Sequence, residues 1–261
     1  MTLAHRGPYN ESVRKRLIAT IVTLASLMAF AAHAAEPRVV LERYLARATA
    51  TPLRDLTLDV DLILFSPDGR APYATGSQLI TLRMPDRQRV EQVIDGRTEV
   101  RLTVGDKSWR RGPDGKIETL PPQRSQSIVL AVPVHRKVDE ILAEWRALGV
   151  RDTRSHESRQ GGRPVTVIGA MAGERDRPAA WLDPEYGVVR FVGRDGTEAG
   201  NIFTDVTFSD HRPLLGQLFF PYRQEIFRSG RLLLRVLVRA VKVNTSPADS
   251  LFDPASLRAP R

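Results

Sequence analysis

The chain has 261 residues, carries 39 Lys and Arg against 30 Asp and Glu, and contains no cysteine. The lack of cysteine excludes disulfides, thiolate metal ligands, a cysteine nucleophile and lipidation at cysteine. The formal charge of +9 suits an acidic partner or anionic lipid, whereas nucleic acid is disfavoured because the basic strand near the C-terminus has no interleaved aromatic residues for base stacking.

The first 34 residues have the features of a secretory signal peptide. Residues 14–16 are basic, residues 17–30 form an apolar run, and the small-residue pattern Ala-His-Ala ends at Ala34. We therefore predict cleavage after Ala34 and a periplasmic location. The alternative is an uncleaved anchor, but the apolar run is shorter than the ~20 residues that a membrane-spanning helix needs. Residues 35–261 contain no second segment of that length and no linker or repeat, so one soluble domain is expected.

A helix followed by a long strand is expected at the start of this domain. Pro37 suits a first helical position, and apolar residues recur at helical spacing until Pro52 ends the helix. Residues 56–65 then alternate between apolar and polar side chains, which predicts a strand. Its apolar face consists of Leu56, Leu58, Val60, Leu62 and Leu64.

The middle of the chain is expected to form an antiparallel meander that one helix interrupts. Short alternating segments predict strands at 77–84, 88–94, 98–104 and 107–110, with turns where aspartate and glycine are adjacent. Apolar spacing predicts a second helix over 136–148, which buries Trp145 and stops at Gly149. Residues 151–162 are interpreted as a polar connection. Further strands are predicted at 164–171, 178–183, 187–192 and 201–208.

The last part of the chain predicts a hairpin of two long strands, 217–228 and 231–243. In the second strand the even positions from Leu232 to Ala240 are all apolar, and at ~3.3 Å per residue the strand would span roughly 40 Å. Its odd positions interleave arginines with Leu233, Leu237 and Val241, which we assign to the opposite face. A segment around Leu251 and Phe252, or a partner, would then cover this second apolar strip.

These elements predict a mainly β (α+β) fold. Many antiparallel strands with one apolar face each must bury that face, and few helices are available to cover it. We expect a curved, incomplete antiparallel β-barrel that wraps two or three helices. Because so few helical side chains cannot fill a large concavity, we also expect an internal hydrophobic cavity, which would stay dry and accept apolar ligands.

An ordered set of short motifs resembles the LolA/LolB-like family of periplasmic lipoprotein carriers. These motifs are GSQLITLRMPDRQR at 76–89, a D-G turn at 95–96, GDKSW at 105–109, FPYR at 220–223, VKVN at 241–244 and LFDP at 251–254. The resemblance spans about residues 36–254 and implies a half-barrel, closed by helices, that holds acyl chains. It also implies an arginine before the strand-ending proline that hydrogen-bonds the lid. Here Met84 has that place, and Arg83 is expected on the opposite face of the strand.

The candidate ligand-binding residues are apolar and are expected to face the cavity. They are Leu58, Val60, Leu62, Leu64, Trp109, Trp145, Leu218, Phe220, Leu234, Val236 and Val238. For each residue the alternative is ordinary packing in the core, because inward strand positions are usually just packed.

No catalytic, metal or cofactor site is predicted. Asp59 and Asp61 have a spacing within the range of paired glycosidase carboxylates, but they share the strand face opposite Leu58, where solvation is the simpler explanation. His156 lacks the spacing of a metal motif, and His135 and His211 are expected at the surface. The chain contains no G-x-S-x-G, P-loop or dinucleotide-binding glycine pattern.

The predicted function is a non-catalytic periplasmic carrier that binds the acyl chains of lipoproteins or lipids. A monomer is expected, with no nucleic acid partner and no cofactor. The alternative is an envelope sensor or interaction module that binds a partner protein, of the inner or outer membrane, through the strip of Leu233, Leu237 and Val241.

Overall fold

The computed structural model describes residues 36–121, 130–131, 133, 135–174, 177–194 and 203–258. Residues Ala35–Arg261 form a compact unit of their own. The predicted signal peptide lies outside the described residues, so both its cleavage after Ala34 and the single-domain assignment stay predictions.

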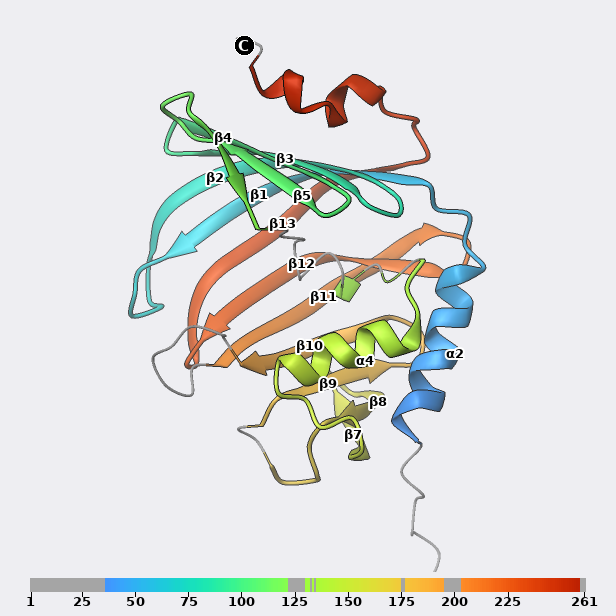
Figure 1. Cartoon of the computed structure of the whole chain (residues 1–261). Helices are drawn as coiled ribbons and strands as arrows, with labels where there is room; N and C mark the ends of the chain where they lie inside the picture. Colours follow the sequence, from blue (N-terminus) through green and yellow to red (C-terminus); the bar gives the residue numbers. More distant parts are fainter. Residues whose placement is uncertain are drawn as a thin grey trace, which may run out of the picture. The chain divides into compact units, whose positions relative to one another are not determined.

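The described chain is dominated by one antiparallel sheet of 13 strands (Figure 1). The strands are β1 (Asp55–Phe65), β2 (Pro72–Arg83), β3 (Arg87–Ile94), β4 (Arg97–Val104), β5 (Lys107–Arg111), β6 (Ile117–Leu120), β7 (Ser155–Gln160), β8 (Arg163–Ile168), β9 (Ala179–Asp183), β10 (Gly187–Arg194), β11 (Phe203–Leu215), β12 (Leu218–Arg228) and β13 (Arg231–Val243). Their order is β6-β5-β4-β3-β2-β1-β13-β12-β11-β10-β9-β8-β7. The sheet is open because β6 and β7 are its two edges.

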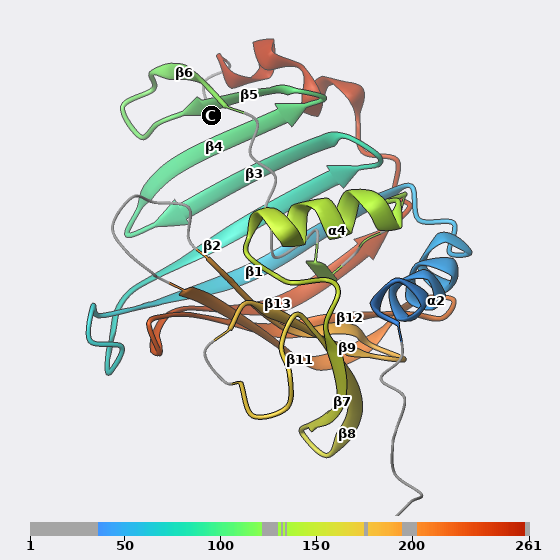
Figure 2. The same cartoon turned by 60° about the horizontal axis from the view of Figure 1, so that its bottom comes forward.

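Two α-helices, α2 (Pro37–Thr49) and α4 (Val138–Ala147), pack on the concave face of this sheet (Figure 2). The apolar stripe of α2 buries Leu41 and Leu45, and α4 buries Trp145, whose ring lies 5.8 Å from that of Phe191 on β10. These side chains share one core cluster with the apolar face of β1. No helix in the described part of the chain is both long and apolar enough to span a membrane.

A β-bulge in β13 changes which of its side chains face the core. Asp59 pairs with Ala240 but Val60 pairs with Val238, so the register shifts between them. After this shift the odd residues Val241 and Val243 pack against the concave core, whereas Ala240 is exposed. The prediction that Val241 shares a strip with Leu233 and Leu237 is therefore wrong.

The C-terminal segment covers the convex face of β3 and β4. It forms two 3₁₀ turns, η1 (Asp249–Phe252) and η2 (Pro254–Leu257), above these strands in Figure 1. Phe252 and Leu257 are buried against Val100 and Leu102, and Trp109 packs against this cluster. Trp109 pairs with Leu102 across β4 and β5, so it lies on the convex face.

Two predictions fail at this face of the sheet. The expectation that Trp109 lines the concave face is wrong, because its strand register places it beneath the C-terminal turns. The expectation that Leu251 and Phe252 cover β13 is also wrong, because they pack on β4 and β5 instead. Arg83 does lie on the convex face, as expected, and its guanidinium bonds Asp249 and the carbonyl of Pro247. Met84 packs against the concave core.

The fold class is confirmed in its main features: a mainly β protein with an open antiparallel sheet and two α-helices. The internal cavity stays a prediction. The polar connection predicted at 151–162 is wrong, since β7 pairs with β8 as an edge hairpin. The side chains of β7 are all polar, so the sequence has no apolar alternation there by which to recognise a strand.

Candidate functional site

The predicted ligand-binding residues other than Trp109 come together in one hydrophobic cluster on the concave side. Those that are buried are Leu58, Val60, Leu62, Trp145, Leu218, Phe220 and Val238. Their burial fits the alternative, ordinary core packing, at these positions. Leu64, Leu234 and Val236 are half-buried and pack against the same cluster.

The half-buried residues form a continuous apolar area, which we call the concave patch, of Leu64, Ile226, Leu234 and Val236. Leu64 and Ile226 both pair with Leu234, from the two strands that flank β13. Val236 is the next concave position of β13 and pairs with Leu62. The patch thus lies across β1, β13 and β12, where β1 ends. It is the part of the predicted site that an apolar ligand could reach.

A hollow lies between α2 and the strands near the β7 edge of the sheet. This α2 pocket has a volume of about 460 Å³ and is lined by Val40, Arg43, Tyr44, Arg47, Glu157, Pro164, Val165, Thr166, Leu182 and Pro184. Its deep residues, including Tyr44 and Leu182, are buried, whereas Arg43, Pro164 and Pro184 are exposed. None of the predicted ligand-binding residues lines it.

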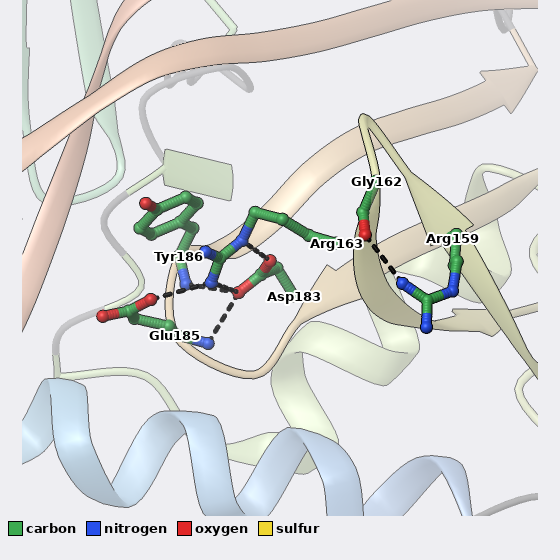
Figure 3. A network of polar contacts seen from close by, with 6 residues as sticks. All are labelled: Arg159, Gly162, Arg163, Asp183, Glu185 and Tyr186. Atoms are coloured by element: carbon green, nitrogen blue, oxygen red, sulfur yellow. Dashed lines mark hydrogen bonds and ion pairs between the residues drawn. The ribbon is translucent and has the colours of Figure 1, made fainter.

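The turn that follows β9 forms one wall of the α2 pocket and is held by a polar network (Figure 3). The fully buried carboxylate of Asp183 accepts hydrogen bonds from the amides of Glu185 (2.8 Å) and Tyr186 (3.0 Å). It also accepts two from Arg163, from Nε at 2.6 Å and from a terminal nitrogen at 3.2 Å. Arg163 in turn pairs with Glu185 at 2.7 Å. The turn is therefore fixed to the start of β8.

Electrostatics keep Asp183 ionised. Burial alone would raise the pKa of Asp183, but the hydrogen bonds from Arg163 and from the two amides outweigh burial, so the pKa is lowered. The guanidinium of Arg163 also lies 4.0 Å from the ring centroid of Tyr186, a cation–π contact. This network positions the turn and offers no free group for chemistry.

The expectation that His211 lies at the surface is wrong, because its side chain is half-buried. Its ring stacks on the ring of Tyr186, with centroids 4.5 Å apart and an interplanar angle of 8°. The ring of Phe219 also packs on Tyr186, with centroids 5.1 Å apart. Burial lowers the pKa of His211 to about 4. Its Nε2 is buried and has no hydrogen-bond partner among the described residues. An uncharged imidazole is thus part of the packing behind the turn.

The other polar candidates have structural partners. Asp59 and Asp61 lie opposite the core face of β1, as expected, and both form ion pairs with Arg239. His156 Nδ1 is 2.8 Å from the Ala170 carbonyl oxygen, and His135 Nε2 is 3.1 Å from that of Leu53. Within the described ranges, no group of three or more His, Cys, Asp or Glu could hold a metal ion.

Comparison with known proteins finds similarity in structure only. No family model and no curated protein matches the chain. A candidate outer membrane lipoprotein-sorting protein domain from Vibrio parahaemolyticus superposes with a TM-score of 0.56 at 12% identity, over 85% of this chain and 98% of that one. A LolA superfamily protein from Nitrosomonas europaea gives 0.52 at 13% identity, over 82% and 98%. The chain has the LolA-like fold.

Another match is a DUF1329 family protein from Desulfovibrio piger, with a TM-score of 0.56 at 10% identity over 85% of this chain and 99% of that one. Each of the three compared structures is covered over at least 98% of its length, and the matches cover 82–85% of this chain. At these identities the likeness is one of fold, and residue roles in this chain rest on its own geometry.

Sequence reasoning found the residues of the concave patch on β1 and β13 but missed the α2 pocket. One signal was present: Tyr44 brings a hydroxyl into the apolar stripe of the first helix, with Arg43 beside it and Arg47 one turn from Arg43. The other wall could not be inferred, because it depends on how β8 and β9 pack against α2. That packing joins segments more than a hundred residues apart.

Proposed function

We propose that this protein is a non-catalytic periplasmic carrier that binds acyl chains of lipoproteins or lipids on the concave face of its LolA-like sheet. The observation that supports this most is the fold shared with the lipoprotein-sorting domain from Vibrio parahaemolyticus. We propose residues of the concave patch as the ligand contacts. The carrier would act as a monomer and deliver its cargo to a membrane or to a membrane partner protein.

The concave patch supports this assignment because its side chains are apolar and only half-buried. Leu64, Leu234 and Val236 present an apolar surface that continues into the packed core. Transfer of apolar chain from water to such a surface stabilises the complex by ~0.8 kcal/mol for each buried methylene. A long acyl chain therefore needs no polar contact for useful affinity, and no bond is made or broken.

The alternative function as an interaction module loses part of its basis. Its proposed interface was the strip of Leu233, Leu237 and Val241, but the bulge in β13 turns Val241 toward the concave core. The two remaining leucines, Leu233 and Leu237, are half-buried. Arg235, which lies between them on β13, forms an ion pair with Glu225 at 2.8 Å.

The carrier proposal is tested by the lipid content of the natively exported protein. The protein is purified from the periplasm without detergent, extracted with organic solvent and analysed by mass spectrometry. We expect co-purified acyl lipid or lipoprotein in a ratio near one per chain. Stripped protein should also take up a fluorescent fatty acid with a blue-shifted emission.

A pair of variants locates the uptake. L64Q/L234Q makes the concave patch polar and should abolish the co-purification of acyl lipid or lipoprotein, whereas Leu79→Gln changes an exposed leucine (42% exposed) on the convex face and should leave co-purification unchanged. Both variants must keep the wild-type circular dichroism spectrum. A natively exported protein that carries no acyl lipid or lipoprotein would overturn the carrier proposal.

A further inference from the structure

We propose that the α2 pocket is a second ligand site that binds a single-chain anionic amphiphile, such as a fatty acid. The pocket shares no residue with the concave patch, so this inference does not depend on the carrier function. Its volume of about 460 Å³ falls within the range of small-molecule sites. Two features of its lining indicate the class of ligand.

The first feature is a predominantly apolar lining. Val40 from α2 and Leu182 from β9 line the pocket, together with the exposed Pro164 and Pro184. The Asp183 network holds the turn that contains Pro184 (Figure 3). A preformed apolar wall of this kind favours a hydrocarbon chain, because little ordering is needed when the chain binds.

The second feature is positive charge at the pocket. Arg43 and Arg47 are one helical turn apart on α2, and in the part of the chain that the structure describes neither guanidinium has an ion pair or a hydrogen bond. One carboxylate, Glu157, also lies at the pocket and accepts a hydrogen bond from Thr166 Oγ1 at 3.0 Å. Two cations against one anion leave a net charge of +1, which suits an anionic head group.

The proposal is tested first by comparing ligands that differ only in the head group. Decanoate, decanol and acetate are titrated into the stripped, natively exported protein by isothermal titration calorimetry. We expect decanoate to bind about tenfold more tightly than decanol, because charge-assisted hydrogen bonds are stronger than neutral ones. Acetate, which lacks the chain, should not bind measurably. Equal affinities for decanoate and decanol would overturn the charge argument.

Charge-removing variants then assign the preference to the pocket. R43Q/R47Q should weaken decanoate about tenfold and change decanol by less than twofold. The matched control R97Q/K107Q removes two exposed cations from β4 and β5, and it should leave both affinities unchanged. An unchanged decanoate affinity in R43Q/R47Q would contradict the proposal.

Methyl NMR of the wild-type protein locates the bound chain directly. Decanoate at low ratio should shift the methyl signals of Val40 and Leu182 first. Shifts confined to Leu64, Leu234 and Val236 would place the ligand on the concave patch, which overturns the second site and supports the carrier proposal. Shifts at Val40 and Leu182 in a protein that co-purifies with no acyl lipid or lipoprotein would support the second site and overturn the carrier proposal.

Discussion

The ring of Tyr44 lies directly against Gly187: a Cβ atom at residue 187 would be 2.2 Å from the Tyr44 hydroxyl oxygen. This contact joins α2 to the first residue of β10, across more than a hundred residues of sequence. Gly187 also has a φ of +80°, which other residues rarely adopt. The glycine is therefore required both for the close approach of the ring and for the turn.

Gly187→Ala should destabilise the protein by about 2–4 kcal/mol, because it adds a steric overlap to a strained backbone. In a Tyr44→Leu background the overlap is removed, and the cost of the same substitution should fall to about 1 kcal/mol. Urea unfolding of the four proteins of this cycle measures both values. Equal costs in the two backgrounds would show that backbone strain alone accounts for the effect.

The C-terminal turns should contribute to stability and not to ligand binding. Phe252 is 4% exposed and packs on the convex face with Leu102 and Trp109, so Phe252→Ala should cost about 2–4 kcal/mol by leaving a cavity. Val93→Ala, at a residue that is 39% exposed, is the control and should change the free energy of unfolding by less than about 0.5 kcal/mol. Fatty acid uptake should be unchanged in both variants. A loss of uptake in Phe252→Ala would mean that the convex cluster takes part in binding.

The sequence predicted most of the sheet because its strands alternate. Residues 56–65 and 231–243 were identified as long strands, and the structure has β1 and β13 at almost the same bounds. Both α-helices were predicted from their apolar spacing, to within one or two residues at most ends. Alternation reports which side chains share a face, and that information is local.

Three features could not be predicted because they depend on distant partners. The bulge in β13 leaves the apolar alternation intact through Ala240, so nothing local marks the change of face. Trp109 was assigned inward because it is apolar, but its face is set by pairing with Leu102 and by cover from Phe252. The burial of His211 results from stacking on Tyr186, which lies in the turn between β9 and β10.

His211 should make the protein less stable in mild acid. Burial lowers the pKa of His211 to about 4, whereas an unfolded histidine has a pKa near 6.5. Below about pH 6.5 the unfolded chain therefore binds more protons at this site than the folded chain, and stability falls as the pH drops toward 4. His211→Phe keeps the stack on Tyr186 but cannot be protonated.

We expect the wild type to lose about 1–2 kcal/mol more than His211→Phe between pH 7.5 and pH 5. Urea unfolding of the two proteins at both values measures the difference. The other groups around the ring, Asp183, Arg163 and Asp210, are common to both proteins and cancel in the comparison. The same loss in both proteins would mean that His211 is protonated in the folded state without penalty.

The contribution of Asp183 to stability should be lost at lower pH than the contribution of His211. Its pKa is lowered in the folded protein below the value of about 3.9 for an unfolded aspartate. The carboxylate therefore stabilises the fold fully above about pH 4, and this contribution is lost as the pH falls through the folded pKa. Asp183→Asn removes the charge and leaves Arg163 without its buried partner, so it should cost about 2 kcal/mol at pH 7.

The difference between wild type and Asp183→Asn should stay constant from pH 7 to pH 5 and shrink below about pH 4. Urea unfolding at pH 7, 5 and 3.5 measures this trend. Asp106→Asn, at an exposed turn residue, is the matched control and should show little difference at any pH. A difference for Asp183→Asn that persists unchanged at pH 3.5 would mean that the amide disrupts the turn sterically. In that case the ion pair with Arg163 would not be what holds the pocket wall in place.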